Sequence, residues 1–149
     1  MKRHLSLFLI FVCTICLIGC SRTVGKDEFL VQLSLNVQEP VHSVTMVLTE
    51  NGQILTKKRM EVDVNHKDRL LYFYFNRKEL KALKDVQGFA VQIYLFTKED
   101  HKNDWNLGNA NSVNGVIQFA PIYGRTYQVH VDGNAKQEFW SSWQEVKTK

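Results

Sequence analysis

The stretch that decides the fold is Phe29-Leu-Val-Gln-Leu-Ser-Leu-Asn-Val37. Apolar residues stand at every second position from Phe29 to Val37, and Gln32, Ser34 and Asn36 alternate with them. Successive side chains of a β-strand point to opposite faces of a sheet. This period of two therefore predicts a strand with one buried face and one polar face.

The segments that follow carry the signal of a β-hairpin. Runs of strand-forming residues at 42–49 and 53–64 flank the dipeptide Asn51-Gly52. Asn and Gly both tolerate the positive φ that the tightest hairpin turns require. A further run, 69–75, is apolar on both faces, and such a pattern predicts a strand in the centre of a sheet.

One short helix is expected after this run. Asn76 is a favoured N-cap residue, and Glu79 stands three positions later, as in a capping box. The pattern predicts a helix over 77–85 that ends before Gly88.

The remaining periodic segments predict more strands, at 89–97, 115–119, 126–132 and 138–146. Many short strands, one small helix and no alternation of strands with helices predict a mainly β fold. We expect an antiparallel β-sandwich of the immunoglobulin-like or transthyretin-like kind over residues 28–146. Tyr127 follows a loop and precedes alternating valines, and it resembles the tyrosine corner of such domains.

The N-terminus has the features of a signal peptide. Lys2 and Arg3 precede an almost entirely apolar run at 5–18, which covers about 14 residues. Roughly 20 residues are needed to cross the hydrocarbon core of a bilayer, so this run fits a signal sequence better than a permanent span.

The apolar run ends in Leu17-Ile18-Gly19-Cys20, which resembles the lipobox of bacterial lipoproteins. The resemblance implies cleavage after Gly19, a signal peptide at 1–19, a lipid on the Cys20 thiol and a short tether at 20–27. Cys13 and Cys16 lie inside the removed segment, so Cys20 is the cysteine left in the mature chain. A disulfide within the chain, a cysteine-based metal site and a cysteine nucleophile are thereby excluded.

Charge gives no sign of a nucleic-acid partner. The chain has 19 Lys and Arg and 15 Asp and Glu. Once Lys2 and Arg3 of the signal peptide are removed, the basic residues exceed the acidic ones by only two. The one basic triplet, Lys57-Lys58-Arg59, is interpreted as a solvated strand face.

The sequence predicts no enzyme, no cofactor and no metal site. The histidines of the mature chain are His42, His66, His101 and His130, and none has a ligand spacing. Segment 99–104 offers several oxygen ligands but lacks the spacing and the central glycine of an EF-hand loop.

Two features could bind a partner. The segment 98–114 shows no periodicity, and loops of that length are often functional; it carries Asn103, Trp105 and Leu107. Trp105 either anchors a partner or folds back over the end of the domain. Near the C-terminus, Phe139-Trp-Ser-Ser-Trp143 predicts a strand whose two faces are both aromatic.

A family resemblance adds a more specific hypothesis. Segment 88–105, an apolar strand followed by an acidic turn and Trp105, and segment 127–134 are similar to parts of the outer-membrane lipoprotein of type VI secretion systems. The resemblance implies a transthyretin-like sandwich that binds the periplasmic domain of an inner-membrane component through the loop between its first two strands. Here that loop is 38–43, which includes Pro40 and His42 and is shorter than the usual loop of the family.

The functional expectation is a lipid-anchored binding or assembly component of a cell-envelope complex, and the family resemblance implies the type VI secretion membrane complex. The alternative is a free-standing immunoglobulin-like lipoprotein that binds a ligand or a host or envelope protein. Either protein would lie at the outer membrane facing the periplasm in a Gram-negative cell, and otherwise on the outer face of the cytoplasmic membrane.

The lipobox yields the first testable prediction. A Cys20→Ser variant should lose incorporation of labelled palmitate and accumulate at the precursor mass, because the acceptor thiol is gone. A Cys13→Ser variant should label and mature normally. Equal labelling of both variants would exclude Cys20 as the lipidation site.

Overall fold

The period-two segments of the sequence form the strands of the structure. The computed structural model describes residues 22–65, 69–81, 83, 86–115 and 117–146. The expected signal peptide, Cys20 and His66 lie outside these residues. The strands are β1 (Glu28–Val37), β2 (Ser43–Glu50), β3 (Gln53–Glu61), β4 (Leu70–Asn76), β5 (Phe89–Phe96), β6 (Asn111–Asn114), β7 (Thr126–Asn134) and β8 (Glu138–Val146). Two short 3₁₀ turns, η1 (Glu99–His101) and η2 (Leu107–Asn109), follow β5.

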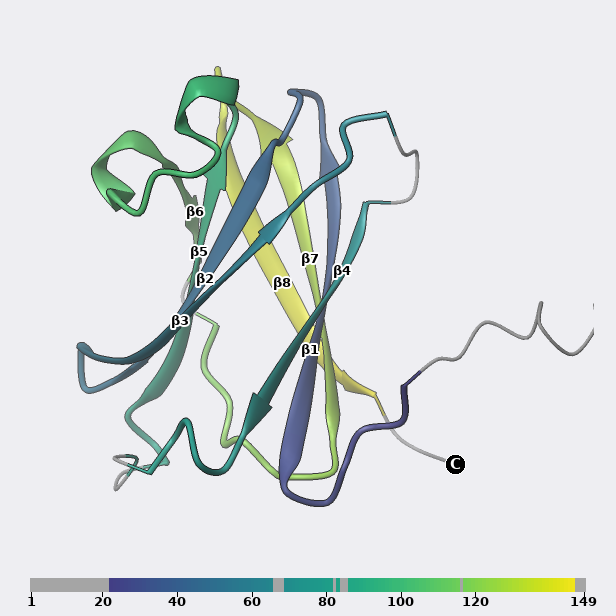
Figure 1. Cartoon of the computed structure of the whole chain (residues 1–149), viewed down its shortest axis with the longest axis vertical. Coiled ribbons are helices and arrows are strands. Elements are labelled where there is room, and N and C mark those ends of the chain that lie inside the picture. The colour runs from purple at the N-terminus through teal and green to yellow at the C-terminus, as the bar shows by residue number, and fades with distance from the viewer. Residues whose placement is uncertain (1–21, 66–68, 82, 84–85, 116, 147–149) are drawn as a thin grey trace, which may run out of the picture.

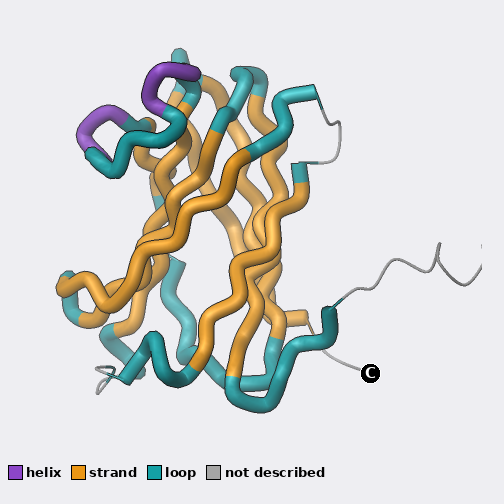
Figure 2. The backbone as a smooth tube through the Cα atoms, in the orientation of Figure 1, coloured by secondary structure: helices purple, strands orange, loops and turns teal. Residues whose placement is uncertain are grey.

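All eight strands belong to one strongly curled sheet that nearly closes into a barrel (Figure 1). The strand order is β3-β2-β5-β6-β8-β7-β1-β4, so β3 and β4 are its two edges. The tube view shows how strands dominate the chain and how loops gather at its upper and lower ends (Figure 2). The prediction of a mainly β fold is confirmed.

The finer prediction, an antiparallel sandwich of two sheets, is not what the structure shows. β1 pairs with β7 in parallel, and β6 pairs with β8 in parallel. The sheet is therefore mixed and continuous. Alternation of apolar and polar residues reports which face of a strand is buried, but it is the same whichever way the neighbouring strand runs.

Two further expectations are corrected by the strand positions. The apolar run at 69–75 forms β4, which is an edge strand and not a central one. Its outward residues Leu70 and Tyr72 are exposed. The strand expected at 115–119 lies instead at 111–114, and Ile117 makes only an isolated bridge to Val91.

The capping box forms, but the described residues of the expected helix at 77–85 are not helical; residues 82, 84 and 85 lie outside the described chain. The Asn76 backbone N–H donates to the Glu79 carboxylate at 2.9 Å, and the Glu79 N–H donates to the Asn76 side chain at 3.0 Å. The described residues of 77–83 then form turns closed by i→i+3 bonds. A capping box organises only a first turn, and burial of Leu80 (3% exposed) draws the chain into the core before a second turn can form.

The hairpin between β2 and β3 follows its sequence signal. Asn51 and Gly52 have φ of 48° and 82°, the left-handed conformation that this pair of residues adopts with little strain.

The core fills the inside of the curled sheet. Its lower part is aromatic: the Phe29 ring stacks on Phe75 at 5.4 Å, and the Phe119 ring stacks on Tyr127 at 3.9 Å. Every residue of the buried core cluster lies between Phe29 and Phe139. A chain that starts just before Arg22 therefore contains the whole core that the described residues form.

Tyr127 forms the tyrosine corner that its sequence setting resembles. It is 1% exposed, its hydroxyl donates to the Ala120 carbonyl at 3.1 Å and it accepts from the Ile122 N–H at 2.9 Å. These bonds tie the segment 120–122 to the first residues of β7. Burial raises the pKa of the Tyr127 hydroxyl above its usual value, which keeps the group protonated as a donor.

Removal of this hydroxyl tests the corner. Tyr127→Phe should lower the free energy of unfolding by about 1–2 kcal/mol, because two buried backbone groups lose their partner. Tyr94→Phe is the matched control, since within the described chain the Tyr94 hydroxyl donates to the Gln92 side chain on the surface and to no backbone group. Urea denaturation of both variants measures the difference, and equal stability would show that the corner contributes nothing.

Candidate protein-binding cleft

The structure places the predicted binding residues at one end of the barrel. The loop 38–42 and the segment 97–110 both lie at the upper end, because β1 and β5 run toward it and β2 starts there (Figure 1). The Ser43 hydroxyl donates to the Lys102 carbonyl at 2.7 Å and so joins the two loops. Three of the predicted binding residues are exposed, namely Pro40, Asn103 and Trp105. The other two, His42 and Leu107, are partly buried.

The segment that carries Trp105 is held by its own side chains. Asp104 accepts from the Asn106 N–H at 2.7 Å and from the Asn109 side chain at 2.5 Å, and Asn106 caps η2 through the Gly108 N–H. The hydrogen bond from Asn109 and then that from Asn106 lower the pKa of the Asp104 carboxyl. The carboxylate is thus kept charged where it holds the turn together.

Arg59 of β3 is the residue on which this segment rests. Its guanidinium lies 4.3 Å from the ring centroid of Phe96 and 4.5 Å from that of Trp105, between the two rings. Its Nε donates to the Thr45 hydroxyl at 2.9 Å and its Nη1 donates to the Lys102 carbonyl at 3.2 Å. Burial lowers the pKa of Arg59 from its usual value, and the nearby Asp104 opposes that change.

The sequence left open whether Trp105 anchors a partner or folds back over the end of the domain, and the structure has features of both. It packs on Arg59, yet 54% of its surface remains exposed. A fixed, half-exposed tryptophan on an arginine loses little conformational entropy when a partner covers it.

A cleft runs from Trp105 between the two edge strands. It has a volume of about 310 Å³ and is lined by Lys57, Lys58, Arg59, Met60, Tyr72, Phe73, Tyr74 and Trp105. Within the described chain, β3 pairs only with β2 and β4 pairs only with β1. The cleft is the place where the barrel stays open, and it combines positive charge with aromatic surface.

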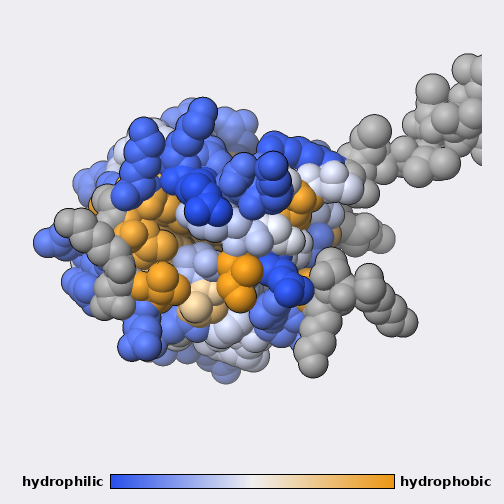
Figure 3. Space-filling model, turned by 90° about the horizontal axis from the view of Figure 1, so that it is seen from below, coloured by the Kyte–Doolittle hydropathy of each residue, from blue (hydrophilic) through white to orange (hydrophobic). Residues whose placement is uncertain are grey.

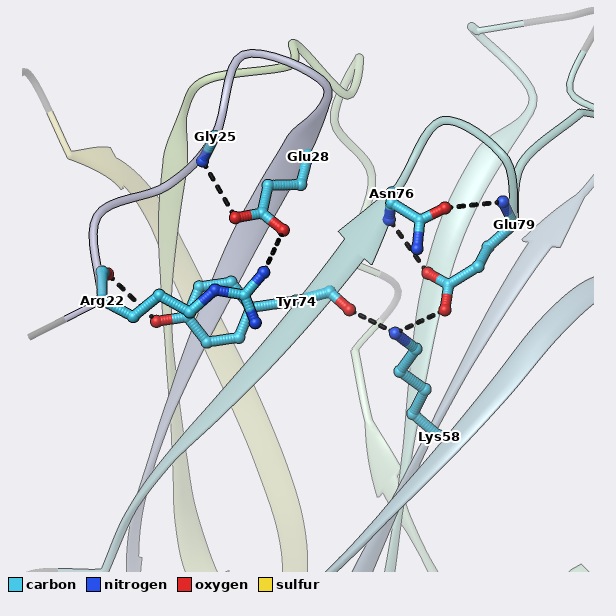
Figure 4. Close-up of polar contacts among 7 residues, drawn as sticks. All are labelled: Arg22, Gly25, Glu28, Lys58, Tyr74, Asn76 and Glu79. Carbon is cyan, nitrogen blue, oxygen red and sulfur yellow. Dashed lines mark hydrogen bonds and ion pairs between the residues drawn. The ribbon is translucent and has the colours of Figure 1, made fainter.

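Lys58 bridges the lower part of this opening (Figure 4). Its ammonium donates to the Tyr74 carbonyl, forms a 2.7 Å ion pair with Glu79 and lies 4.9 Å from the Phe75 ring centroid. Glu79 is oriented by its capping bond to Asn76. A side chain thus satisfies one backbone acceptor at an edge that has no neighbouring strand.

The sequence did not predict the roles of Arg59 and Lys58. The basic triplet was interpreted as a solvated face, whereas two of its three side chains are partly buried in long-range contacts. The sequence does place this triplet in one predicted strand and two tyrosines, Tyr72 and Tyr74, in the next predicted strand. It does not show that the two strands are the edges of the sheet and face each other across a cleft.

The aromatic residues near the C-terminus lie elsewhere, on β8. Phe139 is buried, and the Trp143 ring packs 5.3 Å from Phe119. Trp140 points away from them and is 54% exposed, as much as Trp105.

The described part of the chain contains neither a metal-binding cluster nor a membrane-spanning helix. No three His, Cys, Asp or Glu residues lie close enough there to hold a metal ion. No helix in the same part is long and apolar enough to span a membrane.

The fold class is thus a curled, mixed β-sheet domain with an opening between its two edge strands, and solved structures resemble it only distantly. "Structure of the membrane-binding domain of pneumolysin" matches at 10% identity and a TM-score of 0.36, over 82% of this chain and 99% of that one. "Structure of a disulfide locked mutant of Intermedilysin with human CD59" matches at 10% identity and a TM-score of 0.34, over 83% of this chain and 25% of that one. "Crystal Structure of Gram Negative Toxin" matches at 10% identity and a TM-score of 0.32, over 83% of this chain and 24% of that one. No family model and no curated protein matches the chain. At these scores the likeness identifies no family.

Arg59 can be tested as the support of the Trp105 segment. Arg59→Met keeps most of the apolar stem but removes the bonds to Thr45 and Lys102, so amide exchange over 101–110 should accelerate about tenfold or more. Lys57→Met, a change of charge at an exposed neighbouring position, should leave that exchange unchanged. Equal protection in both variants would show that the segment holds its shape without Arg59.

Proposed function

We propose that this protein is a lipid-anchored binding component of the cell envelope that recruits a protein partner at the cleft between β3 and β4. The observation that carries the proposal is the half-exposed Trp105 ring held on Arg59 at the head of an open sheet edge. The lipid anchor in this proposal is the one that the lipobox at Cys20 predicts.

The lining of the cleft supports a protein partner. Trp, Tyr and Arg are the residue types that most often dominate the binding energy of protein interfaces. Trp105 and Tyr72 are both more than one-third exposed, while Arg59 is held between rings and needs little reorganisation.

The open edges support an extended segment as the part of the partner that binds. An edge strand presents unpaired N–H and C=O groups, and added strands commonly use them. Lys57, Lys58 and Arg59 give the cleft a positive charge, so acidic residues in the incoming segment would complement it.

The type VI membrane complex is a narrower form of this proposal. The family resemblance of segments 88–105 and 127–134 favours it, and it names an inner-membrane secretion component as the partner. The loop 38–42 with Pro40 and His42 lies at the same upper end as Trp105 and could extend such an interface. A free-standing lipoprotein with a different partner is the alternative.

A pull-down with matched tryptophan variants tests the proposal. The full-length lipidated protein is purified in mild detergent from its own cells, and stoichiometric partners are identified by mass spectrometry. Trp105→Ala should weaken binding of that partner about 30-fold or more, as expected for a hot-spot tryptophan worth at least 2 kcal/mol. Tyr72→Ala should act in the same direction.

Trp140→Ala is the control for loss of an exposed tryptophan, because Trp140 is equally exposed but lies on β8. Thermal unfolding of each variant must match the parent. Partner binding that survives Trp105→Ala, or is lost equally in Trp140→Ala, would contradict binding at the cleft. An inner-membrane secretion component as partner would support the type VI form, and its absence from cells that express it would favour the free-standing form.

A further inference from the structure

The lower end of the barrel differs in charge from the upper end. β1 starts at the lower end, so the chain before it, the turn after β4 and the segment before β7 all lie there (Figure 1). The described basic residues of these loops are Arg22, Lys26, Arg77, Lys78, Lys81 and Arg125, and the acidic ones are Asp27 and Glu79. At the upper end, acidic residues such as Glu99, Asp100 and Asp104 outnumber basic ones in the described loops.

Three of these six basic residues form ion pairs within the described chain: Arg22 with Glu28 at 2.6 Å, Arg77 with Asp27 at 3.4 Å and Arg125 with Glu145 at 3.7 Å. Glu79 pairs with Lys58 of β3. Lys26, Lys78 and Lys81 are exposed and make no ion pair with another described residue.

Apolar side chains are exposed at the same end. Ile122 and Val86 are 49% and 43% exposed, and the view from below shows hydrophobic surface bordered by hydrophilic residues (Figure 3). A cavity of about 590 Å³ opens here, and its lining includes Arg77, Lys78 and Lys81. Exposed apolar side chains bordered by lysines are suited to the interface of a bilayer with anionic headgroups.

The start of the described chain is fastened near this end (Figure 4). The Arg22 side chain forms a 2.6 Å ion pair with Glu28, and its guanidinium lies 4.2 Å from the ring centroid of Tyr74. The Tyr74 hydroxyl donates to the Arg22 carbonyl at 3.2 Å. The described chain therefore begins at a fixed point of the domain.

We propose that the lower end of the barrel, which carries Lys26, Lys78 and Lys81 and the exposed side chains of Ile122 and Val86, docks on an anionic bilayer surface. The inference rests on the proposed function for its biological setting, because a lipid on Cys20 would bring this end to the membrane. Docking holds the upper loops and Trp105 away from the bilayer, where a partner can reach them. Each lysine close to an anionic surface contributes roughly a fivefold gain in binding.

Vesicle binding tests the docking surface without the lipid. The chain beginning at residue 21 contains the complete core and is mixed at low salt with vesicles of phosphatidylcholine containing 30% phosphatidylglycerol, or of phosphatidylcholine alone. It should sediment with the anionic vesicles and not with the neutral ones. Replacement of Lys26, Lys78 and Lys81 by Gln should weaken binding about 100-fold, as expected from three fivefold contributions.

The matched control removes the same charge elsewhere. Replacement of Lys57, Lys98 and Lys136 by Gln should leave vesicle binding within about threefold of the parent. Equal binding of the two triple variants, or no binding of the parent to anionic vesicles, would overturn the proposal. Those results would leave lipidation of Cys20 and binding at the cleft intact, because neither is measured by this assay.

Orientation is tested with a single environment-sensitive dye. The chain beginning at residue 21 has no cysteine, so Ile122→Cys and Asn103→Cys each create one labelling site, at the lower and upper ends. The dye at position 122 should gain fluorescence on anionic vesicles, while the dye at position 103 should not change. A gain at position 103 alone would show that the opposite end binds the membrane.

Discussion

The opening between the two edge strands, β3 and β4, is the constraint on which the rest of the structure depends. A barrel removes its edges by pairing the last strand with the first, but here the sheet ends in β3 on one side and β4 on the other. Unpaired backbone groups at such edges need other partners. Lys58 supplies one across the opening, and the Trp105 segment, held by Arg59, covers its upper part. The cleft lined by basic and aromatic side chains thus arises because the sheet does not close.

The same constraint explains the unusual sequence of β4. An edge strand that is apolar on both faces is a site of aggregation unless its outer face is covered. Here the outer face of Tyr74 is covered by the Arg22 guanidinium, and Tyr72 lines the cleft. The run of apolar residues that suggested a central strand therefore belongs to an edge strand, in which Arg22 covers Tyr74 while Leu70 and Tyr72 remain exposed. Period and hydropathy alone cannot separate these two situations, since both place apolar residues on each face of the strand.

Local signals in the sequence predicted local structure. The alternation in 29–37, the positive φ of Asn51 and Gly52 and the hydroxyl of Tyr127 each depend on residues close in the chain. What failed depends on distant residues or on competition between them. The parallel pairing of β1 with β7 joins segments almost one hundred residues apart and leaves no mark on either alternation. The capping box at Asn76 formed without a helix, because Glu79 also binds Lys58 and the following Leu80 enters the core. β6 has the sequence Asn-Ser-Val-Asn, which lacks the apolar alternation by which strands are recognised.

Strand direction connects the two proposals. Because β1 runs upward from the lower end, the N-terminal attachment and the turns after β4 and before β7 lie at the same end. The segment with Trp105 follows β5, which runs toward the opposite end. A lipid alone would hold a domain by one flexible point, about which the domain could rotate. The contacts of Arg22 with Glu28 and Tyr74 shorten that attachment, and a second contact through lysines would fix the axis of the barrel relative to the surface. A partner would then meet Trp105 and the cleft in one orientation, which raises the effective concentration of the binding site without any new contact at the interface.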